Sequence, residues 1–443
     1  MTEKFRIHGG EILRGEVSID GAKNSVLKLL AASILVKGCV KIYNVPDLTD
    51  VGIMLNVLSD LGAKLDYNKV EKSVMIDSTN ISSVTAKYEL VSKMRASFTI
   101  LGALISRCRE AIVALPGGCA IGERRVDFHI KGLEALGAKI KIENGYVHAK
   151  ATKMVGTDIC LDIPSVGATE NLMLAAVTAQ GATRIQNAAQ EPEIVDLANF
   201  LNALGADISG AGTSEIVING VKIEDLHSIE YTTIPDRIEA GTFMAAVVAT
   251  KGKALIKNIY PAHLTFFSDK LIQMGANIKL ADPTTIEVSC RNRLNSINFV
   301  TQPYPGFPTD LQAIAMTLLT TANGVGIITE SLYENRFMQV PDLRRMGADI
   351  HQDRNHAIIK GVKHLTGATV AASDLRAGAA LVIAALMASG ESIVEKLHHI
   401  DRGYDAFETK LTNLGAKITR FNDDVYENVI NSNTKGVINE SRL

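Results

Sequence analysis

The sequence predicts an α/β protein of two domains, each with pseudo-threefold symmetry, with a cleft between them. The main observation is an internal repeat, because a pattern such as Leu133-Glu-Ala-Leu-Gly-Ala-Lys-Ile occurs six times. Units of about 70 residues are long for a solenoid, whose repeats usually have roughly 20–45 residues. Six such units therefore favour two closed bodies of three. Their glycines, 68 to 75 residues apart, are Gly62, Gly137, Gly205, Gly275, Gly347 and Gly415.

Each repeat contains a helix that ends at this glycine and a strand that follows it. The leucines or methionines three residues apart share one helix face. Glycine can end the helix because it adopts the left-handed conformation without steric cost. The alternating residues that follow, as in Ala138–Ile142, predict a strand.

A second helix in each repeat is apolar on nearly every side, which is typical of a buried helix. We therefore expect one inner and one outer helix in each repeat, together with several strands. The polar segment 425–443 carries no repeat and is expected to be a mobile or loosely docked extension. The segments that predict inner helices are Leu29–Val36, Leu172–Ala179, Phe243–Thr250 and Ala379–Ala388.

The composition is that of an ordinary globular protein, with 443 residues, 47% hydrophobic residues, 21% charged residues and a net charge of −2. This low charge argues against nucleic acid or an anionic membrane as a partner. No apolar stretch of about 18 residues and no signal core occur, so we expect a cytoplasmic protein without a membrane span. The five cysteines form no CxxC pair, which fits a reducing compartment. Because GxxxxGK[ST], GxGxxG and HExxH motifs are also absent, no metal or cofactor is predicted.

Polar side chains occur at the expected starts of all six inner helices. A helix N-terminus offers unpaired N–H groups and partial positive charge, so an added Lys or Arg makes it a candidate anion site. The alternatives are capping for Ser, Thr and Asp and a solvated role for the cations. Recurrence in six repeats favours ligand binding, because folding alone requires no cations there. The residues are Lys23 and Asn24, Arg95, Ser165 with Thr169, Arg237, Thr309 with Asp310, and Asp374 with Arg376.

Cys119 occupies a glycine-rich loop, Leu115-Pro-Gly-Gly-Cys-Ala-Ile-Gly, which is expected to be mobile. Arg124 and Arg125 follow closely, and nearby cations lower the pKa of a thiol and raise its reactivity. The local sequence leaves a reactive and a structural role open for Cys119, and His129 alone is interpreted as structural. A buried structural role is expected for the four cysteines that lie in or beside apolar segments, Cys39, Cys108, Cys160 and Cys290.

Ten ordered motifs across residues 5–424 resemble the UDP-N-acetylglucosamine 1-carboxyvinyltransferase family of enolpyruvyl transferases. The resemblance implies two inside-out α/β barrels of three repeats, one at 23–233 and one at 1–22 plus 234–424. It also implies transfer of the enolpyruvyl group of phosphoenolpyruvate to the 3-hydroxyl of UDP-N-acetylglucosamine. This addition–elimination passes through a tetrahedral intermediate, releases phosphate and begins peptidoglycan precursor synthesis. The motifs are Gly21-Ala-Lys-Asn-Ser, Met94-Arg-Ala-Ser, Leu115-Pro-Gly-Gly-Cys, Ser165-Val-Gly-Ala-Thr, Glu191-Pro-Glu-Ile-Val-Asp, Pro235-Asp-Arg-Ile-Glu, Phe307-Pro-Thr-Asp, Glu334-Asn-Arg-Phe, Asp374-Leu-Arg-Ala and His399-Ile-Asp-Arg-Gly-Tyr.

The resemblance also implies roles for individual residues. Cys119 matches the proton donor to C3 of phosphoenolpyruvate and the site of fosfomycin alkylation, and Asp310 matches the base for the sugar hydroxyl. Lys23 and Arg402 complete the catalytic set. The residues matched to phosphoenolpyruvate binding are Lys23, Asn24, Arg124, Arg336, Arg376 and Arg402. Those matched to the UDP-sugar are Asn24, Arg95, Arg124, Arg125, Val126, Asp127, Phe128, His129, Ser165, Val166, Gly167, Asp310 and Leu332.

Two positions depart from the family, and two other functions compete. Arg125 replaces a Pro of some members, and Ile163 replaces a Lys that would contact the diphosphate, a charge that Arg125 could supply.

The sister enzyme acting on shikimate 3-phosphate shares the fold but lacks the Gly-Gly-Cys loop at Cys119. A non-catalytic scaffold would need a basic or apolar outer face, which the low net charge does not favour. Substrate binding is expected to close the domains, and the oligomeric state is not fixed by the sequence.

Overall fold

The computed structural model describes residues 3–116 and 126–422 of this chain. These residues form two compact units. The Lys23 unit consists of Ile19–Glu239 and Gln302–Pro308, less its undescribed loop. The Asp310 unit takes the described residues of Met1–Ser18, Ala240–Thr301 and Thr309–Leu443. The sequence-based domain limits remain a prediction, and they did not assign residues 302–308 to the first domain.

The described residues form six four-stranded sheets, three in each unit, which share one topology. Two strands pair in parallel at one edge, and the remaining two join them in antiparallel pairs. The sheets of the Lys23 unit run β14 (Glu230–Thr232)–β3 (Cys39–Tyr43)–β5 (Ser73–Asp77)–β4 (Lys64–Asn68), β6 (Thr85–Ala86)–β7 (Glu110–Ala114)–β9 (Tyr146–Lys150)–β8 (Lys139–Glu143) and β10 (Asp158–Cys160)–β11 (Ala182–Gln186)–β13 (Glu215–Asn219)–β12 (Asp207–Ser209). Those of the Asp310 unit run β2 (Arg14–Ser18)–β15 (Lys253–Lys257)–β17 (Thr285–Ser289)–β16 (Asn277–Asp282), β18 (Phe299–Val300)–β19 (Val325–Thr329)–β21 (His356–Lys360)–β20 (Asp349–Asp353) and β22 (Thr369–Ala371)–β23 (Glu391–Glu395)–β1 (Glu3–His8)–β24 (Lys417–Asn422).

Strands from distant parts of the chain complete a sheet in each unit. In the Lys23 unit β14 pairs in parallel with β3, with Tyr231 opposite Ile42. In the Asp310 unit β1 lies between β23 and β24, and Phe5 faces Val394 on one side and Arg420 on the other. The next strand, β2, pairs with β15 of a different sheet. In each unit, therefore, strands from the two ends of its part of the chain lie in one sheet and close the body, as a threefold arrangement of repeats requires.

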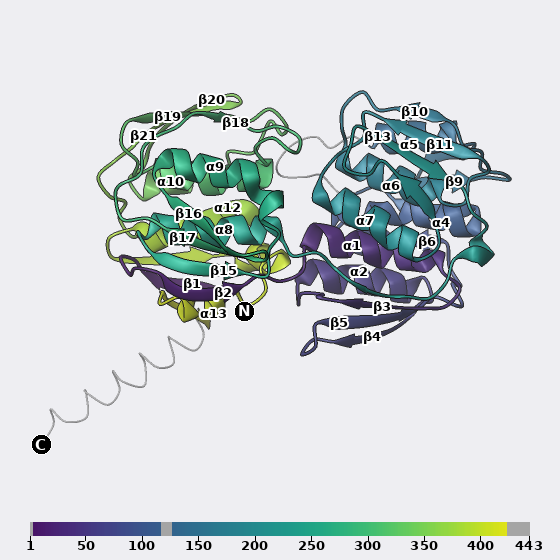
Figure 1. Ribbon diagram of the computed structural model, residues 1–443, viewed down its shortest axis with the longest axis horizontal. Helices are drawn as coiled ribbons and strands as arrows, with labels where there is room; N and C mark the ends of the chain where they lie inside the picture. Colours follow the sequence, from purple (N-terminus) through teal and green to yellow (C-terminus); the bar gives the residue numbers. More distant parts are fainter. Residues whose placement is uncertain (1–2, 117–125, 423–443) are drawn as a thin grey trace, which may run out of the picture. The chain divides into compact units, whose positions relative to one another are not determined.

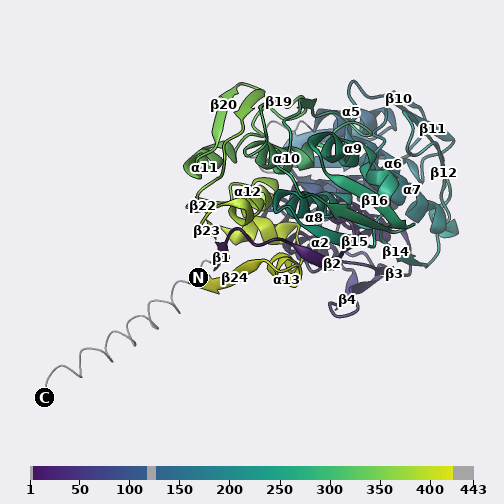
Figure 2. The same cartoon turned by 60° about the vertical axis from the view of Figure 1, so that its left-hand side comes forward.

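The inner helices are buried on nearly all sides, as predicted. Every residue of α10 and almost all of α12 are buried, and Figure 1 shows both helices between β1 and the sheet of β18 to β21. In Figure 2 α12 lies beside α10 and next to the strand β23. The helices are α1 (Lys23–Ala32), α4 (Ile100–Cys108) and α6 (Val166–Ala176) in the Lys23 unit, α8 (Arg237–Ala249), whose first turn belongs to that unit, and α10 (Gln312–Leu319) and α12 (Leu375–Met387) in the Asp310 unit.

One contact between inner helices requires glycine. A Cβ atom at Gly102 of α4 would lie 2.2 Å from the backbone oxygen of Asn171 in α6. The Gly102 N–H instead donates to the Asn171 side chain at 2.5 Å. The two helices can therefore approach closely only without a side chain at this point.

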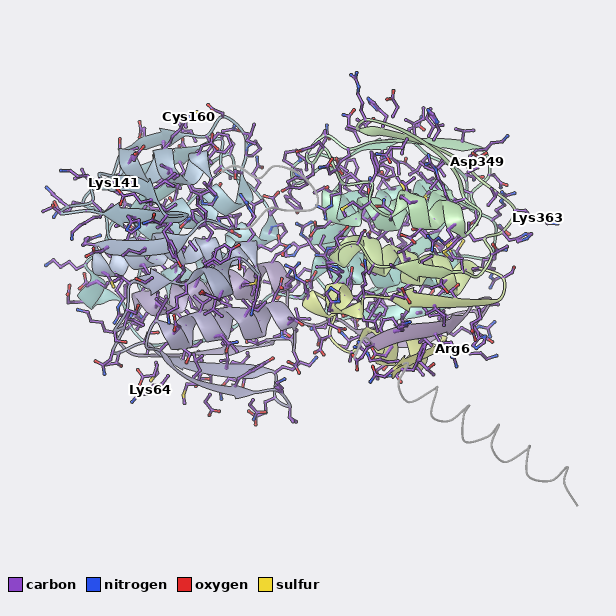
Figure 3. All side chains as sticks on the ribbon, turned by 180° about the vertical axis from the view of Figure 1, so that it is seen from behind. Arg6, Lys64, Lys141, Cys160, Asp349 and Lys363 are labelled. Atoms are coloured by element: carbon purple, nitrogen blue, oxygen red, sulfur yellow. The ribbon has the colours of Figure 1, made fainter. Side chains whose placement is uncertain are left out.

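The outer helices end as the sequence predicts. All six repeat glycines have φ between 92° and 110°, which is the left-handed conformation expected after a helix. Charged side chains such as Lys64, Lys141 and Lys363 extend from the outside of the molecule (Figure 3). The outer helices are α2 (Thr49–Asp60), α5 (Asp127–Ala135), α7 (Pro192–Ala203), α9 (Thr265–Met274), α11 (Val340–Arg345) and α13 (Phe407–Asn413), and α3 (Tyr88–Val91) is a short additional turn.

The expected burial of four cysteines is wrong for two of them. Cys290 is buried and Cys108 is intermediate, but Cys39 and Cys160 are exposed. Cys39 begins β3 and Cys160 ends β10, and in both strands it is the neighbouring residue that points inward. Strand alternation therefore overrides the apolar surroundings. None of the helices in the described part of the chain is long and apolar enough to cross a bilayer.

Candidate active site

The predicted polar residues do stand at the starts of the inner helices, and some of them make contacts that stabilise the fold. Ser165 accepts an N–H of the first turn of α6 at 3.4 Å, and Asp374 accepts two N–H groups of α12 at 2.9 and 3.1 Å. The Thr169 hydroxyl accepts the Ala189 N–H at 3.1 Å. Ser165 and Asp374 therefore cap their helices, Thr169 has a structural contact, and the UDP-sugar contact of Ser165 stays a prediction.

Lys23 is held at both ends by carboxylates of the Lys23 unit. Its N–H donates to Asp236 at 3.0 Å, and Asp236 also accepts two N–H groups at the start of α8. The Nζ of Lys23 lies 2.8 Å from Oδ2 of Asp50, which is in the first turn of α2. Asn24 follows Lys23 in the first turn of α1. The sequence did not reveal Asp50 or Asp236 as partners, because helix starts rich in Asp usually indicate capping.

His129 is buried in α5 with a defined tautomer. Asn171 accepts the Gly102 N–H through Oδ1, so its Nδ2 faces Nδ1 of His129 at 2.8 Å and donates to it. Nε2 of His129 therefore carries the proton. A methyl group added at Gly167 would lie 3.5 Å from this nitrogen. His129 thus presents a neutral N–H donor to the start of α6, where the sequence predicted UDP-sugar contacts.

We expect the His129 imidazole to remain neutral between about pH 5 and pH 8. Burial, with smaller contributions from Arg95 and Lys28, lowers its pKa to about 3. Because the folded pKa lies below the ordinary value of 6.5, the stability from this group should be lost as the pH falls from 6.5 toward 3. NMR of the ring Cε1–H across this pH range measures the titration of His129. A His129 titration near 6.5 would contradict the buried network.

A buried ion pair joins α1 to α6 in the same unit. Nζ of Lys28 lies 2.5 Å from Oε2 of Glu170, and the two side chains are 10% and 0% exposed. Within residues 3–116 and 126–422, Oε1 of Glu170 has no hydrogen-bond partner. Burial raises the pKa of Glu170 to about 7, against the opposing effect of Lys28. The two helices that carry Lys23 and Ser165 are therefore joined by a pair that the sequence did not identify.

In the Asp310 unit, one carboxylate contacts two arginines. Oδ1 of Asp310 lies 2.6 Å from Nη2 of Arg336, and Oδ2 lies 2.9 Å from Nη2 of Arg376. The arginine side chains are only 7% and 4% exposed, whereas that of Asp310 is 26% exposed. Burial would raise the pKa of Asp310, but Arg376 and Arg336 outweigh it and hold the pKa well below its usual value. The structure thus brings together three of the predicted residues.

The two arginines are supported differently. Nη1 of Arg376 donates to the Tyr404 hydroxyl at 3.3 Å, and this hydroxyl lies 2.9 Å from that of Thr242. Nη1 of Arg336 is buried and has no hydrogen-bond partner among the described residues. A buried guanidinium with an unused donor is suited to bind an anion. Tyr404 and Thr242 were missed because they join helix and turn segments far apart in the sequence.

The comparisons with known proteins agree with one another. The sequence model described as EPSP synthase (3-phosphoshikimate 1-carboxyvinyltransferase) matches residues 7–411. The UDP-N-acetylglucosamine 1-carboxyvinyltransferase 2 of Carboxydothermus hydrogenoformans is 53% identical over 422 residues, which cover 95% of this chain and 100% of the relative. The chain belongs to the UDP-N-acetylglucosamine 1-carboxyvinyltransferase family. It is a transferase enzyme, and the scaffold alternative is excluded.

Solved structures confirm the predicted α/β fold of this carboxyvinyltransferase family member. The enolpyruvyl transferase NikO from Streptomyces tendae is 27% identical, with a TM-score of 0.86 and coverage of 95% of this chain and 99% of that one. EPSP synthase from Acinetobacter baumannii is 18% identical, with a TM-score of 0.72 and coverage of 95% and 100%. The second likeness shows the fold alone.

The remaining site residues predicted from the family resemblance are not all described. Cys119, Arg124 and Arg125 lie outside the described residues, as does the segment 425–443. Arg402 ends the 3-10 helix η6 (Leu397–Arg402) and lies close enough to His399 to lower its pKa, after the larger effects of burial and His398. The other positions are Arg95 at the start of η2 (Arg95–Thr99), Val126, Asp127 and Phe128 at the start of α5, Val166 at the start of α6, and the exposed Leu332 and Ile163.

No group of three or more His, Cys, Asp or Glu side chains that could hold a metal ion occurs in the described part of the chain. Among the charged groups that the described residues bring together are an Asp with two Arg in the Asp310 unit and Lys–carboxylate pairs in the Lys23 unit. These groups can bind anions and exchange protons. The expectation that no metal or cofactor takes part stays a prediction.

Proposed function

We propose that the enzyme transfers the enolpyruvyl group of phosphoenolpyruvate to the 3-hydroxyl of UDP-N-acetylglucosamine, with release of phosphate. The reaction supplies peptidoglycan precursor synthesis in the cytoplasm. The identity of 53% to a carboxyvinyltransferase named for this sugar nucleotide supports the substrate. The observation that carries the chemistry is the Asp310–Arg336–Arg376 cluster, which combines a candidate base with two anion-binding groups.

The two arginines are proposed to bind the carboxylate of phosphoenolpyruvate. Arg336 has a buried, unused Nη1 donor among the described residues, and Arg376 is oriented by Tyr404. A planar guanidinium matches a carboxylate through two parallel hydrogen bonds, which Lys cannot provide. The phosphate is assigned to Lys23, Arg124 and Arg402 on the family resemblance.

Asp310 is proposed to accept the proton of the sugar hydroxyl. Arg376 and Arg336 hold the pKa of Asp310 well below the usual value, which makes it a weak base. An anion bound to the same arginines would reduce the positive field at Asp310 and raise its pKa toward the ordinary range. The order of events would then favour deprotonation only after phosphoenolpyruvate is bound.

The UDP-sugar is proposed to bind at the helix starts of the Lys23 unit. His129 offers an N–H donor near Gly167, and Arg95 stands at the start of η2. The exposed Ile163 offers no charge to a diphosphate, so Arg125 is proposed to provide it. Cys119 is proposed to protonate C3 of phosphoenolpyruvate, by its match to the family.

Phosphate release by the purified enzyme tests this function directly. With phosphoenolpyruvate present, release is expected with UDP-N-acetylglucosamine and not with shikimate 3-phosphate. Release only with shikimate 3-phosphate would keep the fold and reassign the acceptor, because the sister enzyme shares the architecture. Release with neither acceptor would contradict the proposed reaction.

A further inference from the structure

Glu330 is a buried carboxylate beside the Asp310–Arg336 ion pair and outside the proposed substrate contacts. It follows β19 directly and is 2% exposed. Its Oε1 accepts the hydroxyl of Thr301 at 2.8 Å and the N–H groups of Leu332 and Tyr333 at 2.9 and 3.2 Å. Its Oε2 accepts the hydroxyl of Thr309 at 2.9 Å. Four donors from three chain segments therefore meet at one side chain.

These contacts connect the two segments that carry the Asp310–Arg336 ion pair. Thr309 directly precedes Asp310, and the N–H groups of Leu332 and Tyr333 begin the turn that leads to Arg336. Nη2 of Arg336 then lies 2.6 Å from Oδ1 of Asp310. The chain segments that lead to Asp310 and to Arg336 are thus both hydrogen-bonded to the carboxylate of Glu330.

The carboxylate of Glu330 also binds the two residues that flank segment 302–308. Residues Gln302–Pro308 are grouped with the Lys23 unit, whereas Thr301 and Thr309 on either side belong to the Asp310 unit. Each threonine donates its hydroxyl to a different oxygen of Glu330. Without the hydrogen bond from Thr309 to Glu330, the backbone at Thr309 would be more mobile. Asp310, the next residue, would then be held less firmly.

We propose that Glu330 is a positioning residue for enolpyruvyl transfer, which acts through Thr309 to keep Asp310 in register with Arg336. This inference rests on the proposed role of Asp310. Displacements of about 1 Å at a catalytic group can cost about a hundredfold in rate. A hydrogen bond that fixes the residue next to the base can therefore affect turnover without contacting substrate.

The decisive variant is Thr309→Val, which removes the hydroxyl and keeps the branched shape. We expect kcat to fall by about tenfold or more, with little change in the thermal unfolding midpoint. Thr309→Ser retains the hydroxyl and should restore kcat to within about threefold of the original, because the bond to Glu330 can reform. A purely structural role predicts no such rescue in kcat for a folded enzyme.

Thr301→Val provides the matched control, because it removes the other hydroxyl from the same carboxylate. Thr301 is 0% exposed and does not adjoin Asp310 in the chain. Compared with Thr309→Val, Thr301→Val should therefore lower the unfolding midpoint more and kcat less. Equal losses of kcat in the two valine variants, or no rescue by Thr309→Ser, would overturn the proposal. Full activity of Asp310→Asn would instead overturn the role of Asp310. If Asp310→Asn is inactive and Thr309→Val is fully active, only the positioning role of Glu330 fails.

Discussion

Replacement of Asp310 by Asn is expected to lower kcat for phosphate release by about 10²–10⁴-fold, the range typical of general acid–base groups. The affinity for phosphoenolpyruvate should not fall with it. Asp310 occupies Arg336 and Arg376 at 2.6 and 2.9 Å before substrate arrives. Removing its charge leaves both guanidinium groups available to the substrate carboxylate. The variant should therefore bind phosphoenolpyruvate at least as tightly while it turns over slowly.

Steady-state phosphate release gives kcat, and calorimetric titration with phosphoenolpyruvate gives the Kd. The matched control is Glu408→Gln, which removes a carboxylate 2.8 Å from Arg420 in the same unit. This variant should retain kcat, because nothing places Glu408 at the reacting groups. Parallel losses of binding and turnover in Asp310→Asn would show that Asp310 mainly orders the arginines and is not the base.

Replacement of Lys28 by Met is expected to lower the free energy of unfolding of the Lys23 unit by about 3–5 kcal/mol at alkaline pH. The change leaves Glu170 buried without its cation, and its Oε1 already lacks a hydrogen-bond partner in the described chain. The pKa of Glu170 is about 7 even with Lys28 present. Without Lys28 the carboxyl is protonated at still higher pH, so the loss of stability should shrink as the pH falls below 7.

Urea unfolding on either side of pH 7 measures this difference. The double variant Lys28→Met, Glu170→Met should recover most of the stability, because it removes both buried charges and fills similar volume. A double variant as unstable as Lys28→Met alone would assign the loss to packing and not to charge. A loss that grows as the pH falls would contradict the sign derived from Glu170.

Local patterns in the sequence were sufficient to predict the repeated parts of the fold. The helix ends at Gly62 and its five equivalents depend only on residues within one turn, and all of them were predicted correctly. The buried helices α1, α6, α8 and α12 followed from their apolar composition. The predicted burial of Cys39 and Cys160 was wrong, because it followed from their apolar neighbours. The alternation of side chains along each strand, which the same residues show, places both cysteines on the exposed face.

The partners of the candidate site residues could not be predicted in the same way. Lys28 and Glu170 are 142 residues apart in the chain, and only the fold brings them together. A signal did exist, since each is a charge in an otherwise apolar helix and such charges are almost always paired. Asp310 was predicted with capping as an alternative, and its contacts with Arg336 and Arg376 became visible only when two neighbouring repeats were assembled.

The place of β1 between β23 and β24 has a consequence for how the enzyme is made. Ribosomes synthesise β1 long before its partners at Glu391–Glu395 and Lys417–Asn422, which lie near the other end of the described residues. At about 5–20 residues per second, the strand waits for tens of seconds. The Lys23 unit, by contrast, has nearly all of its residues once Glu239 has left the ribosome. The unit that holds Asp310 must therefore keep β1 unpaired until these partners emerge, and the strand is accessible to chaperones and proteases during that time.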